Sequence, residues 1–71
     1  MYYAFQVETL ESFNGCQYHK IVKKAENRAE AIIQIARDAV SHGLTIEEIA
    51  FEGQYLEAPR NCSSTFRHHL F

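Results

Sequence analysis

The chain has few glycines, few cysteines and no long hydrophobic run, and each shortage excludes a class of protein. Its three glycines are scattered, so it lacks a glycine-rich loop that could cradle a phosphate group. Its two cysteines, Cys16 and Cys62, are too few for a disulfide-dense secreted domain, and we expect both to be free thiols. No stretch is long enough to span a bilayer, and Met1 to Thr9 contains no apolar signal segment. We therefore expect a cytoplasmic protein.

The composition favours one small folded domain. Of the 71 residues, 46% are hydrophobic, which is enough apolar material for a core. A domain this short buries only about 60% of the surface that its unfolded chain exposes, so self-association or docking on a partner often stabilises it further. The formal net charge of −2 argues against a protein that binds duplex DNA mainly by neutralising phosphates.

Alternating apolar residues predict a β-hairpin at the start of the chain. The segment from Tyr2 to Thr9 has the period of a half-buried strand, and Gln17 to Ala25 is predicted as the second strand. Between them, Phe13-Asn14-Gly15 supplies turn residues. The residues expected on the apolar face of the hairpin are Tyr3, Phe5, Val7 and Ile21.

Two turns compete to set the register of this hairpin. A two-residue Asn14-Gly15 turn pairs Val7 with Val22 but mixes charged residues into the apolar face. A three-residue loop with Gly15 in the left-handed conformation keeps that face apolar, and we prefer it for this reason. The preferred register pairs Tyr3 with Ala25, Val7 with Ile21, and Glu8 with Lys20.

A capping box predicts a helix after the hairpin. In Asn27-Arg28-Ala29-Glu30 the Asn27 side chain can accept from the first-turn amides, so the helix should run from Arg28 to about His42. Gly43 fits the residue just past the helix end, and Leu44 can fold back on the last turn. The side expected to cover the hairpin is Ala29, Ile32, Ile33, Ala36 and Val40.

The segment after the helix has two interpretations. Thr45-Ile46-Glu47-Glu48 is itself a capping-box pattern and could begin a short helix, whereas the alternation from Ile49 to Tyr55 indicates a third strand. We favour the strand, with a bulge or a close backbone approach at Gly53. The expected fold class is therefore α+β, a small ββαβ domain in which one amphipathic helix packs on one face of an antiparallel three-stranded sheet.

The ordered domain is expected to cover residues 1–58. From Pro59 onward the pattern breaks, and residues 59–71 are predicted to form a C-terminal arm, either mobile or as a short helix beginning near Ser63. This arm mixes basic and aromatic residues. Three of its members, Arg60, Arg67 and His68, are candidate partner-binding residues.

The histidines and cysteines do not have the spacing of a familiar metal site. Cys16 and His19 form only an isolated pair, and His68 and His69 are adjacent instead of three to five residues apart. Neither cysteine lies at a predicted helix start, where its thiolate would be stabilised. We therefore predict no metal, no cofactor and no catalytic residues, and a protein that is not an enzyme.

The most credible binding surface is a basic patch on the second strand. Lys20, Lys23 and Lys24 lie near Tyr18 and could meet phosphates or an acidic protein surface. The alternative interpretation is an edge strand that its lysines keep from aggregating.

Two resemblances bear on function. Gly43 to Ala50 resembles the link between the first two helices of helix-turn-helix DNA-binding domains, and Ser63 to Arg67 resembles the start of a recognition helix. In size, acidic balance and ββαβ order, however, the whole chain is similar to the compact accessory proteins of bacteriophages, including anti-CRISPR inhibitors. That similarity implies an inhibitor that docks on a host nucleic-acid-handling protein complex, with no cofactor and no turnover.

Two other functions stay open at this point. One is direct nucleic-acid binding, through the hairpin or as a helix-turn-helix-like transcriptional regulator. The other is a structural role as a homodimer formed by edge-strand pairing.

Overall fold

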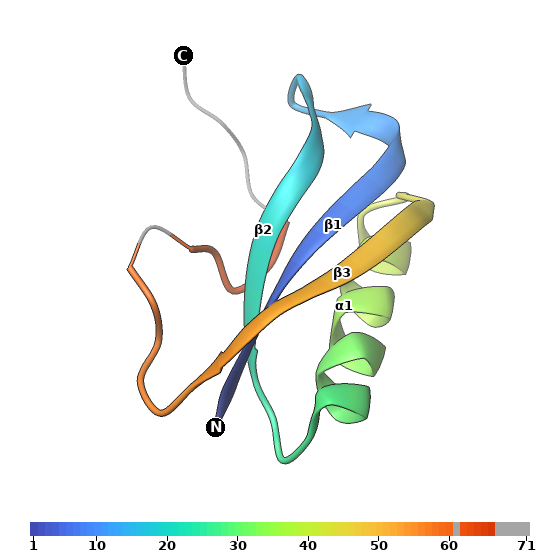
Figure 1. Cartoon of the computed structure of the whole chain (residues 1–71). Helices are drawn as coiled ribbons and strands as arrows, with labels where there is room; N and C mark the ends of the chain where they lie inside the picture. The colour runs from blue at the N-terminus through green and yellow to red at the C-terminus, as the bar shows by residue number, and fades with distance from the viewer. Residues whose placement is uncertain (61, 67–71) are drawn as a thin grey trace.

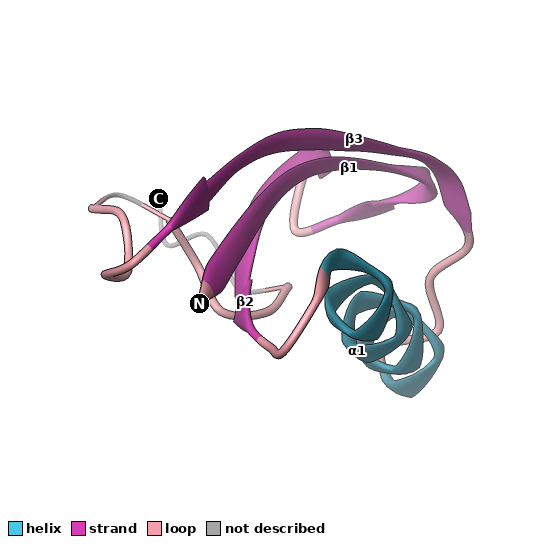
Figure 2. Ribbon diagram, turned by 60° about the horizontal axis from the view of Figure 1, so that its bottom comes forward, coloured by secondary structure: helices cyan, strands magenta, loops and turns pink. Residues whose placement is uncertain are grey.

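Three antiparallel strands form an open sheet in the order β2-β1-β3, and one helix lies across one face of it (Figures 1 and 2). The computed structural model describes residues 1–60 and 62–66. The elements are β1 (Tyr2–Phe13), β2 (Cys16–Lys24), α1 (Arg28–Ser41) and β3 (Ile46–Tyr55). The predicted α+β class and ββαβ order are confirmed. The helix of the described residues is too short and too polar to cross a membrane.

The three-residue loop preferred from the sequence is wrong, and neither predicted register holds beyond the turn. Asn14 and Gly15 have φ angles of 51° and 84° and form a two-residue turn that pairs Phe13 with Cys16. The register then shifts between Glu8 and Phe13, so that along the rest of β1 the pairs include Phe5 with Ile21, Val7 with His19, and Glu8 with Tyr18. The predicted apolar face is nevertheless correct, since Tyr3, Phe5, Val7 and Ile21 are all buried.

The register shift comes from a bulge in β1 that side chains hold in place. Thr9 is 1% exposed, and its hydroxyl donates a hydrogen bond to the Glu11 carbonyl at 2.7 Å. From β2, the Gln17 amide donates to the Leu10 carbonyl at 2.9 Å. The extra residues of β1 are thus accommodated locally, which brings Ile21 opposite Phe5 in the core.

Both ends of α1 follow the prediction. The Asn27 side chain accepts from the Glu30 amide at 2.8 Å and caps the first turn. At the other end Gly43 has a φ of 69°, its amide donates to the Val40 carbonyl at 3.1 Å, and the Leu44 amide donates to the Ala39 carbonyl at 2.8 Å. This is a Schellman motif, and it folds Leu44 back into the core.

The predicted buried side of α1 is largely wrong. The helix buries Ala31, Ile35 and Ala39 against the sheet, with only Ile32 of the predicted set packed on the core, while Ile33 and Val40 are 53% and 79% exposed. Polar contacts to β2 explain this rotation. Asp38 forms an ion pair with Lys23, and the Gln34 amide donates to the Lys24 carbonyl at 3.3 Å, so this side of the helix must face β2.

The third strand is confirmed, and so is its irregularity near Gly53. The register with β1 shifts between the pairs Ala4–Gly53 and Phe5–Phe51, which leaves Glu52 as the extra residue. The alternative helix starting at Thr45 is wrong, because Ile46 already belongs to β3. The described residues therefore do not form the second helix that the helix-turn-helix resemblance of Gly43 to Ala50 requires.

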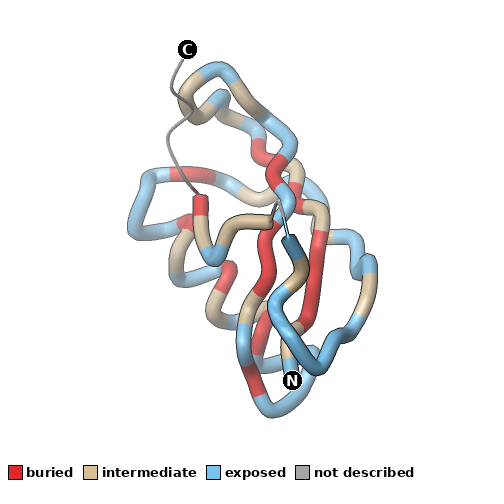
Figure 3. Tube along the Cα trace, turned by 90° about the vertical axis from the view of Figure 1, so that its left-hand side faces the viewer, coloured by how far each residue is buried: buried red, intermediate tan, exposed pale blue. Residues whose placement is uncertain are grey.

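The last described segment packs back on the domain (Figure 3). Ser63 pairs with Ile21 in parallel orientation, and its carbonyl accepts from the Val22 amide at 2.8 Å. The segment from Cys62 to Phe66 is not helical, so a helix starting at Ser63 is not formed within it. Phe66 is 2% exposed and belongs to the same core cluster as Phe5 and Ile35. Part of the expected arm thus covers the free edge of β2 and completes the core.

Candidate docking surface on the open sheet face

The face of the sheet opposite α1 is the main uncovered surface of the domain, and we call it the outer face. Figure 2 shows the helix below one side of the curved sheet, and no described helix or strand lies over the other side. Alternation along each strand decides which side chains reach it. Its polar and aromatic members are Tyr2, Gln6, Glu8, Tyr18, Lys20, Lys24, Glu48, Glu52 and Tyr55.

Charges on the outer face are segregated by strand. Lys20 and Lys24 lie on β2, at one side of the sheet, whereas Glu48 and Glu52 lie on β3, at the other side. The Lys20 ammonium reaches across β1 to the Glu52 carboxylate at 3.4 Å. Because these side chains are 62% and 35% exposed, that ion pair is screened and contributes little to folding. The charged groups therefore remain available to a partner.

Tyrosines frame both ends of the outer face. Tyr18 is 60% exposed at one end, and Tyr55 is 43% exposed at the other, opposite Tyr2. The Tyr55 ring lies over Gly53, because a Cβ atom at Gly53 would be only 2.7 Å from the Tyr55 hydroxyl oxygen. The glycine therefore lets an aromatic ring lie on the backbone of the bulge.

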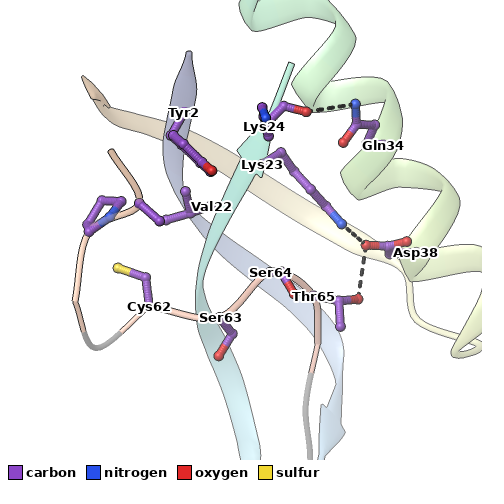
Figure 4. Close-up of a pocket in the computed structure, with 12 residues that line it drawn as sticks. Tyr2, Val22, Lys23, Lys24, Gln34, Asp38, Cys62, Ser63, Ser64 and Thr65 are labelled. Carbon is purple, nitrogen blue, oxygen red and sulfur yellow. Dashed lines mark hydrogen bonds and ion pairs between the residues drawn. The ribbon is translucent and has the colours of Figure 1, made fainter. Parts of the chain in front are cut away.

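The outer face continues into an open hollow at the edge of β2 (Figure 4). Tyr2, Val22 and Lys24 belong to the sheet, and Pro59 and Cys62 form the opposite wall. Its volume of about 520 Å³ is in the range of ligand pockets, but it is open to solvent. Such a hollow can hold one large side chain of a partner protein.

Lys23, on the helix side of β2, also lines this hollow, but its ammonium group is already paired within the domain. It forms an ion pair with Asp38, whose carboxylate also accepts a hydrogen bond from the Thr65 hydroxyl at 2.9 Å (Figure 4). Partial burial raises the pKa of Asp38, but the hydrogen bonds from Lys23 and Thr65 outweigh it and hold that pKa below the ordinary value of 3.8. Asp38 thus connects β2, α1 and the segment after β3.

The structure brings together only part of the predicted binding residues. Tyr18, Lys20 and Lys24 share the outer face, whereas Lys23 points to the opposite side. Arg60 is exposed in the loop after β3, and Arg67 and His68 lie outside the described residues.

Sequence reasoning missed Tyr2 and Tyr55. Tyr2 is in phase with Gln6 and Glu8, so its signal was present in the sequence. Tyr55 has the spacing of the inward-facing Ile49 and Phe51, and it reaches the outer face opposite Tyr2 only because Glu52 is an extra residue in β3. In residues 1–60 and 62–66, no three His, Cys, Asp or Glu side chains come together as ligands for a metal ion.

Comparison of the chain with models of protein families, with curated proteins and with solved structures found no match.

Proposed function

We propose that this protein is a non-enzymatic binding module that docks on another protein through its outer face. The observation that supports this best is the uncovered sheet face with a basic side on β2 and an acidic side on β3. A protein surface can offer both signs of charge, so it can complement both sides at once. The aromatic rings at both ends add the apolar contact area that protein interfaces concentrate at their hot spots.

The acidic side bears on the class of partner. Glu8, Glu48 and Glu52 together would face a basic surface, and proteins that hold nucleic acids carry such surfaces. This supports the hypothesis, drawn from the sequence, of an inhibitor that docks on a host nucleic-acid-handling complex. In that mode the carboxylates would occupy positions that phosphates otherwise take, and the hollow beside Val22 would receive an anchoring side chain.

Direct binding of a single-stranded nucleic acid is the second candidate. Exposed tyrosines on an open sheet can stack on bases, and Lys20 and Lys24 could contact phosphates. The carboxylates on the same face oppose this, because they repel the phosphate backbone.

Charge-reversal variants separate the two candidates. The tagged protein is used to capture partners from host lysate, and binding of the partner identified by mass spectrometry is then measured with purified proteins. We expect E48K/E52K to weaken binding about 100-fold or more, and K20E/K24E to weaken it about tenfold. E26K serves as the control, because Glu26 is exposed in the loop before α1 and does not belong to a strand of the sheet.

A labelled oligothymidylate provides the opposing measurement. If the protein docks on a protein partner, E48K/E52K gains affinity for the oligonucleotide while it loses the partner. Partner binding that survives both double substitutions would refute docking through this face. Salt-sensitive oligonucleotide binding by the unmodified protein, lost in K20E/K24E, would favour the second candidate.

A further inference from the structure

The helix α1 carries a second apolar side that does not face the sheet. Its members, Ala29, Ile33, Ala36 and Val40, are called the helix stripe below, and all four are exposed. Ile33 and Val40 are 53% and 79% exposed, and together with Ala36 and Arg37 they line a shallow and almost entirely apolar groove. An exposed apolar groove of this kind on so small a domain is a candidate interaction surface.

The spacing of the helix stripe is that of a helix-pairing seam. Its residues are separated by four, three and four positions, which is the a/d repeat of a coiled coil. The side that packs on the sheet has a different spacing, because Ala31, Ile35 and Ala39 recur every four residues. Small and large residues also alternate along the stripe, so a large residue can be seated opposite a small one. The fitting occupant is therefore another helix.

Charges beside the stripe specify which helix fits. Glu30 and Arg37 occupy equivalent flanking positions one heptad apart, and within the described part of the chain neither forms an ion pair. In an antiparallel pair, these flanking positions face each other across the seam. A second copy of α1 in antiparallel orientation then places its Arg37 beside Glu30 and its Glu30 beside Arg37. The same arrangement seats Ile33 against the second copy's Ala36, and Val40 against its Ala29.

We propose that two copies of this chain form a symmetric dimer through antiparallel pairing of their helix stripes. A parallel pair would bring Arg37 beside Ile32 of the second copy and Glu30 beside Ala25, which precedes the helix, and neither of these carries a charge. The antiparallel arrangement is therefore the one that the charges select. The outer face lies on the other side of the sheet from α1, and the dimer thus presents two outer faces at the same time. The dimer does not depend on the proposed docking function, because it uses a different side of the molecule.

Sedimentation equilibrium of the purified chain tests the dimer. Over a range of about 10 µM to 1 mM, we expect a concentration-dependent shift from the mass of one chain to twice that mass. I33E/V40E should weaken association at least about 100-fold, because it puts four carboxylates into the seam. L10E is the matched control, since Leu10 is 58% exposed but lies in β1, and it should leave association unchanged.

A charge-swap series tests the orientation. E30R and R37E should each weaken association about tenfold, because each places like charges together across the seam. The double variant E30R/R37E should restore it to within about threefold of the unmodified chain, because the pairs re-form with their signs exchanged. Far-UV circular dichroism and urea unfolding, at concentrations where the chain is monomeric, check that every variant folds. Glu30 and Arg37 are exposed, so this series remains informative even if I33E/V40E fails to fold.

Three results would overturn the proposal. A chain that stays monomeric at 1 mM has no such dimer. A dimer that persists in folded I33E/V40E associates elsewhere, for example through the edge of β3. A charge swap that fails to restore association in the folded double variant excludes the antiparallel seam. None of these outcomes bears on docking through the outer face, so the two proposals can fail separately.

Discussion

Asp38 is the residue in which three parts of the chain meet. Its carboxylate accepts from Lys23 on β2 and from Thr65 in the segment that follows β3, while its own backbone belongs to α1. Glu11 makes a comparable connection between β1 and the start of β3, since it accepts from the Thr45 amide at 2.6 Å and from the Thr45 hydroxyl at 2.8 Å. These hydrogen bonds lower the pKa of Glu11. Both carboxylates thus favour folding in their ionised form.

Acid should therefore destabilise the domain through Asp38. Its pKa in the folded state lies below the ordinary 3.8, so its contribution is complete above that pH and is lost as the pH falls below about 4. At pH 7 we expect D38N to lower the free energy of unfolding by about 1–2 kcal/mol, because the charge-assisted contact with Lys23 is lost. Urea unfolding at a series of pH values from 2 to 7 measures both effects.

The dependence of stability on pH distinguishes the loss of the Asp38 charge from a general loss of stability. D38N should flatten the acid limb of the stability curve, with the remaining slope coming from other carboxyls, Glu11 among them. E57Q, at an exposed site in the loop after β3, should leave that limb as in the unmodified chain. Parallel curves for D38N and the unmodified chain would show that the Asp38 carboxylate does not couple to folding.

At the scale of the elements, several local signals were predicted correctly, whereas the type of the hairpin turn and the non-local contacts were not. The Asn27 cap, the left-handed Gly43 and the alternation of β1 each depend on residues close in the sequence, and all three were predictable. The hairpin register depends on the bulge, which the Thr9 hydroxyl and the Gln17 side chain hold. The residues of the turn do not indicate a register shift of this size.

The prediction of which side of α1 is buried failed for a related physical reason. The helix α1 carries two apolar sides, and hydrophobic spacing alone favours the one with more large residues, which includes Ile33 and Val40. The structure buries the other, because only that rotation brings Asp38 and Gln34 to β2.

On the outer face, strict alternation groups Tyr18, Lys20 and Lys24 and separates Lys23 from them, so this part of the site could be predicted from period two alone. The sequence could not predict that these residues share a face with the carboxylates of β3, because this depends on the order of the strands in the sheet.

The C-terminal cap of α1 makes a prediction at the same scale. G43A should destabilise the domain by about 1 kcal/mol, because Gly43 has a positive φ that a Cβ atom disfavours. No atom lies within 4 Å of the position where that Cβ would stand, so the cost is conformational and not steric. G43N should cost less, because asparagine tolerates the left-handed region better than alanine does. Equal costs for the two variants in urea unfolding would contradict this assignment.

At the scale of the whole molecule, the core depends on a residue beyond the last strand. The Phe66 ring lies 5.0 Å from that of His19 and 6.0 Å from that of His42, measured between ring centroids, and is almost completely buried. It closes one end of the space between sheet and helix. The segment from Cys62 to Phe66 therefore both covers the free edge of β2 and contributes a side chain to the core.

F66A should lower the free energy of unfolding by about 3 kcal/mol, because it removes a buried aromatic ring. L56A is the control, since Leu56 is 84% exposed in the loop after β3 and should change stability by less than about 0.5 kcal/mol. Urea unfolding followed by far-UV circular dichroism measures both. A loss below about 1 kcal/mol for F66A would mean that the segment after Cys62 does not contribute to the core in solution.

The late position of Phe66 also has a consequence for biosynthesis. While the chain leaves the ribosome, the hairpin, the helix and the third strand all emerge before this ring does, and the gap beside His19 stays open to water until it arrives. The nascent chain can form its secondary structure early but can only close its interior late. A chaperone that binds exposed apolar surface would find its target in that interval.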